Sequence, residues 1–441
     1  MLQRNNAADT DLIDRLQRSA FDYFLIHTNP KNGLVADTSL AGSPCSIAAT
    51  GFALSSYPVA VERGWIERGA AVEAVLTTLR FFQESEQGNN RQATGYRGFY
   101  YHFLDMHTGH RVWHCELSLI DSALLFAGML TAAAYFTGDD PAEAEVRALA
   151  KTLYERADWA WALNKGDTLV MGWKPGRFLK YRWQGYNEAI ILYVLALASP
   201  TFPIPERSYE AFTATYQWIQ YEGLDYLYAG PLFIHLFSHA WIDFRDIQDR
   251  FMREKQSDYV RNTQSAIKTQ RAYAAHNPHG FAGYGADVWG LTACDGPSAR
   301  RRLRGGKRQH FVGYAARGAP FGPDDGTIAP WAPLACLPFD EPAAMSGLQA
   351  ILHAYPGLLG QGRFPGSFNP TVVGDGPEGW IDERCVGIDQ GLLVMMIENA
   401  RTGLLWRLMR ENPVIRAGLA RAGFTGGWLS GQAAGKALET V

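Results

Sequence analysis

The 441-residue chain has no run of 18 or more apolar residues that is free of charges and of Gly or Pro breaks. A helix that spans a bilayer needs about 20 such residues, so no membrane-spanning helix is expected. The first residues, MLQRNNAADTDLIDRLQRS, also lack the apolar segment of a secretory signal peptide. The chain as written is therefore predicted to be cytoplasmic, or periplasmic or secreted if a leader precedes it.

The sequence also has few cysteines and a small net charge. The five cysteines show no CxxC or zinc-type spacing, so they are predicted to be small buried residues. The net charge is −3, which excludes a general electrostatic attraction to nucleic acid. The basic run ARRRLRGGKRQ (299–309) is interpreted as a solvated surface loop, with an anion- or partner-binding patch as the alternative.

Motifs for bound cofactors are also missing. There is no Walker-type lysine motif and no GxSxG elbow, and the glycines of GFAGYG (280–285) stand in the wrong order for a dinucleotide site. His235 and His239 have the i, i+4 spacing of a metal pair, but the glutamate of an HExxH motif is absent. Hydrogen bonding to sugar or backbone is favoured for these histidines, and no metal or cofactor is predicted.

What the sequence does contain is an alternation of two kinds of helix along its whole length. Amphipathic helices with charged faces are predicted at 9–27, 67–86, 141–163, 205–220, 256–275, 340–354 and 402–411. Helices that are apolar on most sides and rich in small residues are predicted at 46–61, 115–136, 187–199, 237–251, 327–337 and 387–400. The short β-branched runs of a parallel β/α protein are few.

Helix pairs that each expose one polar face bury their apolar sides best by stacking side by side. Six inner-type helices interleaved with outer ones predict an all-α fold, an (α/α)6 toroid, in a single domain over residues 1–441 with its core at about 12–430. An open helical solenoid is the alternative. In such a ring the inner helices run in one direction, so the loops that feed their N-termini meet at one face.

The loops before the inner helices are long and rich in Gly, Trp, Tyr, His and Asp, which predicts a cleft where they converge. A ligand with flat apolar faces and hydroxyl edges suits such a cleft. The candidate substrate-binding residues are Glu116, Trp173, Trp183, Tyr186, Asn187, His239, Trp241, Asp243, Trp289, Asp325, Trp380 and Gln390.

Carboxyl groups recur at or near the heads of the inner helices, namely Glu116, Asp121, Glu188, Asp243, Asp324, Asp325 and Asp389. Taken singly, each could be a helix cap, worth a few tenths to about 2 kcal/mol. Several carboxyls in one apolar mouth would instead be costly to desolvate, and burial and repulsion would separate their pKa values. Two carboxyls with separated pKa values beside a sugar are the minimum for glycoside hydrolysis.

Among these carboxyls, Glu188 is the predicted general acid. Trp173, Trp183 and Tyr186 flank it in the sequence and would keep it protonated, and Asn187 could cap the helix in its place. Asp389 is the predicted base, because GIDQG surrounds it with small and polar groups that admit water. Asp121 competes for that role, since it is expected five residues into its helix, where a cap explanation fails.

Ordered motifs from residue 12 to residue 430 carry a family resemblance, among them GFYYHFLDM, MGWKPGRFLKYRWQGYNEAIILYVLAL, SHAWIDFRDIQD, DDGTIAP and GIDQG. The chain resembles the bacterial glycoamylase-like family that contains the endo-β-1,2-glucanases, glycoside hydrolase family 144. The resemblance implies an (α/α)6 toroid and inverting hydrolysis of β-1,2-glucan, with Glu188 as the acid and Asp389 also implicated. One departure is WHCELSLID, in which His114 replaces an acid of the family. If that acid binds sugar in relatives, subsite preference in this chain is expected to differ.

Two alternatives stay open at this point. A polysaccharide lyase would need a cationic pocket and a Tyr or His base, whereas a non-catalytic glucan-binding protein would keep the cleft without turnover. The predicted partner is a β-linked glucan, with no nucleic acid and no membrane. Endo or exo action, linear or cyclic substrate and oligomeric state are not set by the sequence.

Overall fold

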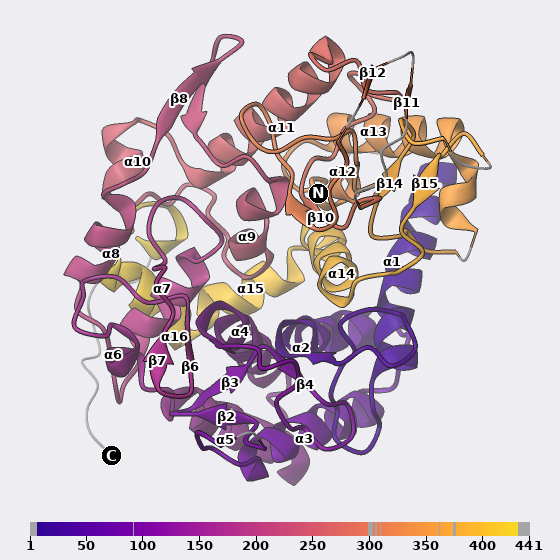
Figure 1. The fold of residues 1–441 in the computed structure, drawn as a ribbon. Helices are drawn as coiled ribbons and strands as arrows, with labels where there is room; N and C mark the ends of the chain where they lie inside the picture. The colour runs from indigo at the N-terminus through magenta and orange to yellow at the C-terminus, as the bar shows by residue number, and fades with distance from the viewer. Residues whose placement is uncertain are drawn as a thin grey trace.

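The computed structural model describes residues 7–90, 92–298, 303–304, 307–308, 310–360, 362–373 and 376–430. These residues are mostly helical, and the strands among them are two to four residues long. Figure 1 shows one set of helices near the middle of the molecule and a second set around it. The inner set is α2 (Ile47–Glu62), α4 (Leu119–Tyr135), α7 (Ile190–Ala198), α9 (Phe237–Trp241), α12 (Ala332–Ala335) and α14 (Gly387–Arg401). The outer set includes α1 (Ala7–His27), α3 (Arg68–Glu84), α5 (Pro141–Glu155), α8 (Arg207–Thr213), α11 (Tyr259–His276) and α13 (Glu341–Ala354).

Neighbouring inner helices pack on one another in chain order. Helix α2 packs on α4, α4 on α7 and α7 on α9, while α14 packs on α9, α12 and again on α2. The contact between α2 and α4 is close because glycines face each other there: a Cβ on Gly128 would collide with the carbonyl of Gly51. The small residues of the inner helices therefore let helix backbones approach, and apolar burial on all sides stabilises them.

Two inner helices are much shorter than predicted. Helix α9 ends at Trp241 because Ile242 is extended, and α12 does not begin until Ala332. The backbone of Ile328 instead exchanges two hydrogen bonds with Phe368, both 2.9 Å long, which excludes a helix at that position. Apolar composition alone marked these segments as buried, but it did not distinguish a helix from extended chain.

The all-α prediction also missed strands that organise the loops. A five-stranded antiparallel sheet has the order β2 (Gly95–Tyr96), β3 (Phe99–Tyr101), β5 (Leu117–Ser118), β6 (Gly172–Lys174) and β7 (Arg177–Phe178). The outer helix predicted at 205–220 is α8 followed by β8 (Trp218–Tyr221), which pairs with β9 (Leu224–Leu227), and the one predicted at 141–163 is divided into α5 and α6 (Trp159–Ala162). Strands this short carry almost no alternation of apolar and polar residues, so the sequence gives little sign of them.

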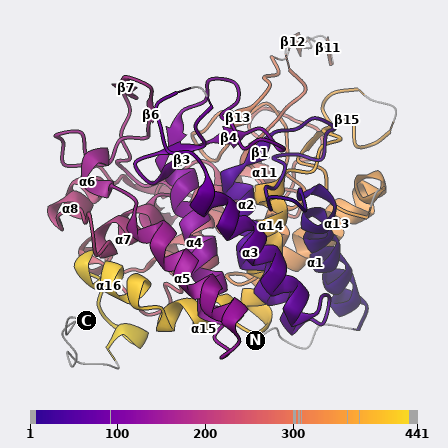
Figure 2. The ribbon, with the colours of Figure 1, turned by 90° about the horizontal axis from the view of Figure 1, so that it is seen from below.

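The strand pairs gather at one end of the helices, as Figure 2 shows for β1 (Cys45–Ser46), β4 (Phe103–Leu104), β6, β7 and β13 (Ala315–Ala316). Helices α15 (Leu404–Glu411) and α16 (Pro413–Arg421) lie toward the opposite end. Strand pairing fixes the first residues of the inner helices: β5 pairs with β3 and β6, and its Ser118 is the N-cap of α4. The loops that feed α4 and α7 are thus held by one sheet.

The five cysteines are buried and free, which confirms the prediction made for them. Within the described ranges, no helix combines the length and the apolar character that crossing a bilayer requires.

Candidate active site

A cavity of about 540 Å³ lies at the heads of the inner helices α4, α7, α9 and α14. Six carboxyl groups line it, those of Asp37, Asp121, Glu188, Asp295, Asp382 and Asp389. The three residues predicted to be catalytic, Glu188, Asp389 and Asp121, are all among them, although they are as much as 268 positions apart in the chain. The structure therefore brings the predicted acid and both candidate bases to one cavity.

Glu188 is not a helix cap. Helix α7 begins at Ile190. Its N-cap residue is Ala189, whose side chain makes no capping hydrogen bond. The Asn187 side-chain oxygen instead accepts a hydrogen bond of 3.0 Å from the Ala189 amide. Ser238 of α9 holds the turn from the other side, because its hydroxyl donates to the Glu188 carbonyl at 2.8 Å and accepts from the Ile191 amide at 3.2 Å. The Glu188 carboxyl is thereby left free to face the cavity.

Apolar side chains surround Glu188 in the cavity, including Leu124, Phe233 and Phe237. Burial raises the pKa of Glu188 to about 7, and the nearby charge of Asp121 acts in the same direction. The predicted apolar setting of this carboxyl is therefore present, but different residues provide it. Trp173 stacks on Tyr96 in the five-stranded sheet, with the ring centroids 4.6 Å apart, and does not line the cavity.

Asp121 lies in the first turn of α4, which corrects its predicted place deeper in the helix. The Ser118 hydroxyl caps the helix by accepting from the Asp121 amide at 3.3 Å, and it also donates to the Asp121 carboxyl. The first turn is thus capped by Ser118, and the carboxyl of Asp121 is oriented by the capping hydroxyl.

His102, which was not among the predicted site residues, lies between the carboxyls of Glu116 and Asp121. His102 lies with Nδ1 2.9 Å from a Glu116 oxygen and Nε2 3.5 Å from an Asp121 oxygen, and its ring stacks on Phe103 at 3.9 Å. Burial lowers the pKa of His102, but the carboxyls of Asp121, Glu116 and Asp37 outweigh it and raise this pKa to about 9. The imidazole is therefore a cation at neutral pH, and its hydrogen bond lowers the pKa of Glu116.

Asp389 lies in the first turn of α14, lines the cavity and is only 6% exposed. Burial raises its pKa well above the ordinary range, and the neighbouring carboxyls of Asp37 and Asp382 raise it further. The pKa of Asp37 is itself raised to about 6, mainly by burial. These shifts favour the protonated form of Asp389.

One arginine neutralises two more carboxyls at the cavity wall. Arg384 binds both oxygens of Asp382, at 2.7 and 3.0 Å, and one oxygen of Asp295 at 2.9 Å. No sequence motif predicted this cluster of Arg384, Asp382 and Asp295. The Asp-x-Arg spacing could not have identified it, because Asp243 and Arg245 form the same bidentate pair at 2.8 and 2.7 Å away from the cavity.

Other carboxyls predicted for the cleft are engaged elsewhere. Asp243 is buried between Arg245 and Arg410, and Asp324 accepts hydrogen bonds from the hydroxyls of Tyr273 and Tyr284. Asp325 forms a buried ion pair with Arg317. These three carboxyls hold loops together and do not line the cavity.

Most of the predicted sugar-contacting side chains also point into the protein. Trp241 and Trp289 are fully buried, and the Trp241 indole donates to the Ser55 hydroxyl at 2.9 Å. These aromatic side chains form part of the core. The sequence alone cannot distinguish an aromatic residue in the core from one that lines a cleft. The remaining candidates outside the cavity lining are Glu116, Trp183, Tyr186, Asn187, Trp380 and Gln390.

The two histidines of HLFSH are buried and bonded within the protein. His235 Nε2 lies 3.1 Å from the Ala229 carbonyl, and His239 Nε2 lies 3.2 Å from the Thr263 hydroxyl. Burial lowers the pKa of His235 to about 4 and that of His239 to about 3. Both are neutral structural histidines, and His239 does not reach the cavity predicted to bind sugar.

A sequence model of the Glycoamylase family, with the description "Putative glucoamylase", matches residues 180–413, more than half of the chain. The chain belongs to this family. The resemblance seen in the sequence motifs is thereby confirmed.

Relatives of this glycoamylase-family chain include an exo β-1,2-glucooligosaccharide sophorohydrolase (non-reducing end) from Parabacteroides distasonis, 27% identical over 450 residues. That match covers 94% of this chain and 58% of the relative, so the chain spans less than two thirds of the relative's length. A crystal structure of a "putative glucoamylase" from Bacteroides uniformis is 30% identical with a TM-score of 0.84, and the match covers 97% of this chain and 100% of that one. An endo-β-1,2-glucanase from Chitinophaga pinensis, solved with sophorotriose and glucose, is 25% identical with a TM-score of 0.83, covering 96% and 99% of the two chains.

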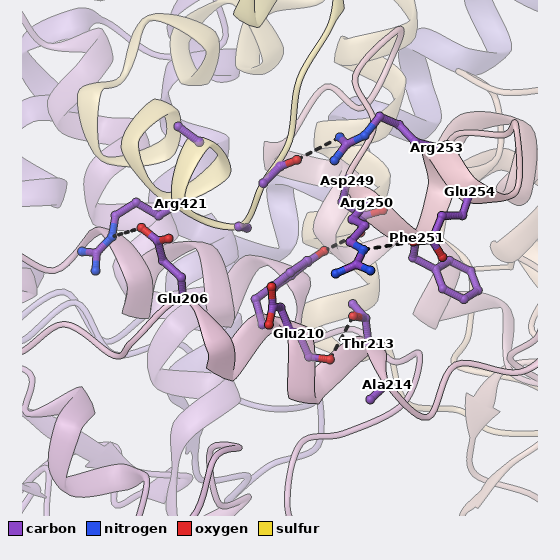
Figure 3. A pocket seen from close by; sticks show the side chains of 14 residues that line it. Glu206, Glu210, Thr213, Ala214, Asp249, Arg250, Phe251, Arg253, Glu254 and Arg421 are labelled. Atoms are coloured by element: carbon purple, nitrogen blue, oxygen red, sulfur yellow. Dashed lines mark hydrogen bonds and ion pairs between the residues drawn. The ribbon is translucent and has the colours of Figure 1, made fainter.

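A second cavity, of about 530 Å³, lies between α8, α10 (Arg250–Glu254) and the end of α16, away from these carboxyls. Figure 3 shows ion pairs among its charged side chains, for example that of Arg421 with Glu206, whose atoms lie 3.7 Å apart. Asp249 accepts from the Tyr209 and Tyr259 hydroxyls at 2.9 and 2.6 Å. The carboxyls of Glu188, Asp121 and Asp389 do not line this second cavity.

The basic run at 299–309 lies outside the described residues except for the backbones of β11 (Leu303–Arg304) and β12 (Lys307–Arg308). Across the described ranges, no cluster of three or more His, Cys, Asp or Glu side chains is arranged to hold a metal ion.

Proposed function

We propose that this chain is a glycoside hydrolase that cleaves β-1,2-glucan on an (α/α)6 toroid in one domain. The observation that carries the proposal is the meeting of Glu188, Asp121 and Asp389, from the heads of three inner helices, in one cavity. The activities of the Parabacteroides distasonis relative and of the Chitinophaga pinensis enzyme, whose structure matches with a TM-score of 0.83, support the choice of substrate. The toroid is supported by the chain-order packing of the inner helices and by the return of α14 to α2.

In the proposed reaction Glu188 is the general acid. A carboxyl with a pKa of about 7 is largely protonated near neutrality, so it can donate its proton to the glycosidic oxygen as the bond to the anomeric carbon breaks. Water then attacks that carbon from the opposite face and gives its proton to a base. The products are a glucan fragment with a new hydroxyl and a fragment with an inverted reducing end.

The environments of the two candidate bases differ. Asp121 has one oxygen 3.5 Å from Nε2 of the His102 imidazolium, and its carboxyl accepts a hydrogen bond from the Ser118 hydroxyl. Asp389 is buried beside two other carboxyls, which favours its protonated form. We therefore place Asp121 ahead of Asp389 as the base, and we assign Asp389 a role in donating a hydrogen bond to the sugar.

Product analysis on linear and cyclic β-1,2-glucans tests the proposed function. We expect release of reducing sugar, with the α-anomer appearing first at the new reducing end in a proton NMR time course. A β-anomer formed first would indicate a retaining enzyme. An unsaturated product detected by absorbance would indicate the lyase alternative, and tight binding without release of sugar would indicate a non-catalytic protein.

The pKa of Glu188 predicts the alkaline limb of the pH profile. Because the acid must be protonated, kcat/KM for β-1,2-glucan is expected to fall tenfold per pH unit above about pH 7. Steady-state rates from about pH 5 to about pH 9, a range that brackets this pKa, would show the limb. A profile that stays flat through about pH 8 would exclude Glu188 as an acid with this pKa.

A further inference from the structure

A groove of about 610 Å³ lies directly beside the cavity. The two share a wall, because Ala36 and Ser39 line the groove while Asp37 and Thr38 between them line the cavity. The groove combines apolar side chains such as Leu40 with polar groups such as Asp105. That mixture suits a ligand with both apolar faces and hydroxyl edges.

Trp113 lines this groove and is 68% exposed, which is unusual for the largest apolar side chain. Its ring packs on Phe103 with the centroids 5.2 Å apart. Phe103 lines the cavity and also stacks on the ring of His102 beside Asp121. An unbroken series of rings therefore joins the groove to the carboxyls of the cavity.

The backbone that presents Trp113 is strained. Trp113 and His114 both have left-handed conformations, with φ of 54° and 49°, which bulky residues rarely adopt. Arg111 stabilises this turn by donating to the carbonyls of Cys115 at 2.6 Å and His114 at 2.8 Å, and its guanidinium stacks over Tyr101. An exposed indole adds little to the stability of the core, so packing does not explain a strained turn that holds it in solvent. Strained backbone of this kind is typical of binding sites.

We propose that Trp113 and its groove bind the glucose units of a β-1,2-glucan that extend beyond the cavity. This inference rests on the proposed function, because the groove would take the same chain that the cavity cleaves. One face of the exposed indole is available to stack on the apolar face of a glucose ring. Binding there would favour long substrates over short ones.

The test compares kcat/KM of the Trp113→Ala variant on long linear β-1,2-glucan and on the shortest sophorooligosaccharide that the wild type cleaves. We expect a loss of about tenfold on the long glucan and less than about twofold on the short one. Trp113→Tyr should restore most of the activity, since an aromatic face is retained. The matched control is Tyr181→Ala, because Tyr181 is also 68% exposed but lines neither the groove nor the cavity.

The outcomes separate this inference from the proposed function. Failure of the wild type to cleave any β-1,2-glucan would overturn the proposed function and the inference together. Wild-type cleavage combined with an equal loss for Trp113→Ala at every chain length would overturn the inference alone. Thermal melting of each variant checks its fold, and an exposed ring predicts an unchanged melting temperature.

Discussion

Replacing Glu188 with Gln is expected to lower kcat/KM for β-1,2-glucan by about a thousandfold or more while the chain stays folded. Gln has the same shape as Glu but no proton to donate, so the glycosidic oxygen would leave as an unprotonated alkoxide. The Glu188 side chain makes no hydrogen bond to another described side chain that the substitution would break, and its backbone carbonyl keeps the Ser238 contact. Release of reducing sugar measures the loss, and circular dichroism checks the fold.

A substrate with a good leaving group separates the acid from the base. A dinitrophenyl glycoside of sophorose needs no proton for departure, so Glu188→Gln should hydrolyse it at a rate near that of the wild type. The variant that lacks the base should lose activity on both substrates. We expect this for Asp121→Asn, whereas the same result for Asp389→Asn alone would reverse our order of the two bases. Turnover of glucan by Glu188→Gln at the wild-type rate would refute the assignment of the acid.

The Glu188→Gln variant should have a larger free energy of unfolding than the wild type at high pH. A carboxyl whose pKa rises from 4.5 to about 7 on folding binds its proton more tightly in the folded chain. The free energy of unfolding therefore falls as pH rises between these two values. Gln has no such penalty, so the two proteins should match below about pH 4.5, and the variant should be about 1–2 kcal/mol more stable above pH 7, after allowance for the partial exposure of the site. Urea unfolding at both pH values measures the difference.

The sequence pattern predicted the helices and the central carboxyls because both are repeated features. Apolar helices such as α2 and α14 are buried on all sides, and that burial leaves a long, unmistakable apolar run. Glu188 and Asp389 stand out because each is the first charge before or within such a run. Both residues line one cavity, as expected if the loops that feed the inner helices meet at one face.

What the sequence pattern did not predict depends on contacts between distant loops. His102 faces Glu116 and Asp121 because β3 pairs with β5, a pairing of two- and three-residue strands. Aromatic residues near the inner helices are likewise ambiguous, since Trp241 at the end of α9 is fully buried whereas Trp113 in the loop before α4 is largely exposed. Only the folded loops decide which ring meets solvent.

The second large effect is expected at the ion pair that supports one wall of the cavity. Arg317 is fully buried and Asp325 is 4% exposed, and they are joined by two hydrogen bonds of 2.7 and 2.8 Å. Arg317→Met would leave the Asp325 carboxylate buried without its cation, so we expect a loss of about 3–5 kcal/mol in the free energy of unfolding. The matched control is Arg80→Met, because the pair of Arg80 and Glu145 is exposed and should contribute less than about 1 kcal/mol.

Arg317 also donates to the carbonyls of Cys294, Val312 and Gly313, and these strands and turns carry Tyr314 over the cavity. A double variant, Arg317→Met with Asp325→Leu, removes the unpaired charge and should regain most of the stability. It cannot regain the hydrogen bonds to the loop, so its kcat/KM should stay low even though it is folded. Stability and activity would then recover separately, whereas recovery of both would show that the ion pair supports the fold and not the geometry of the cavity.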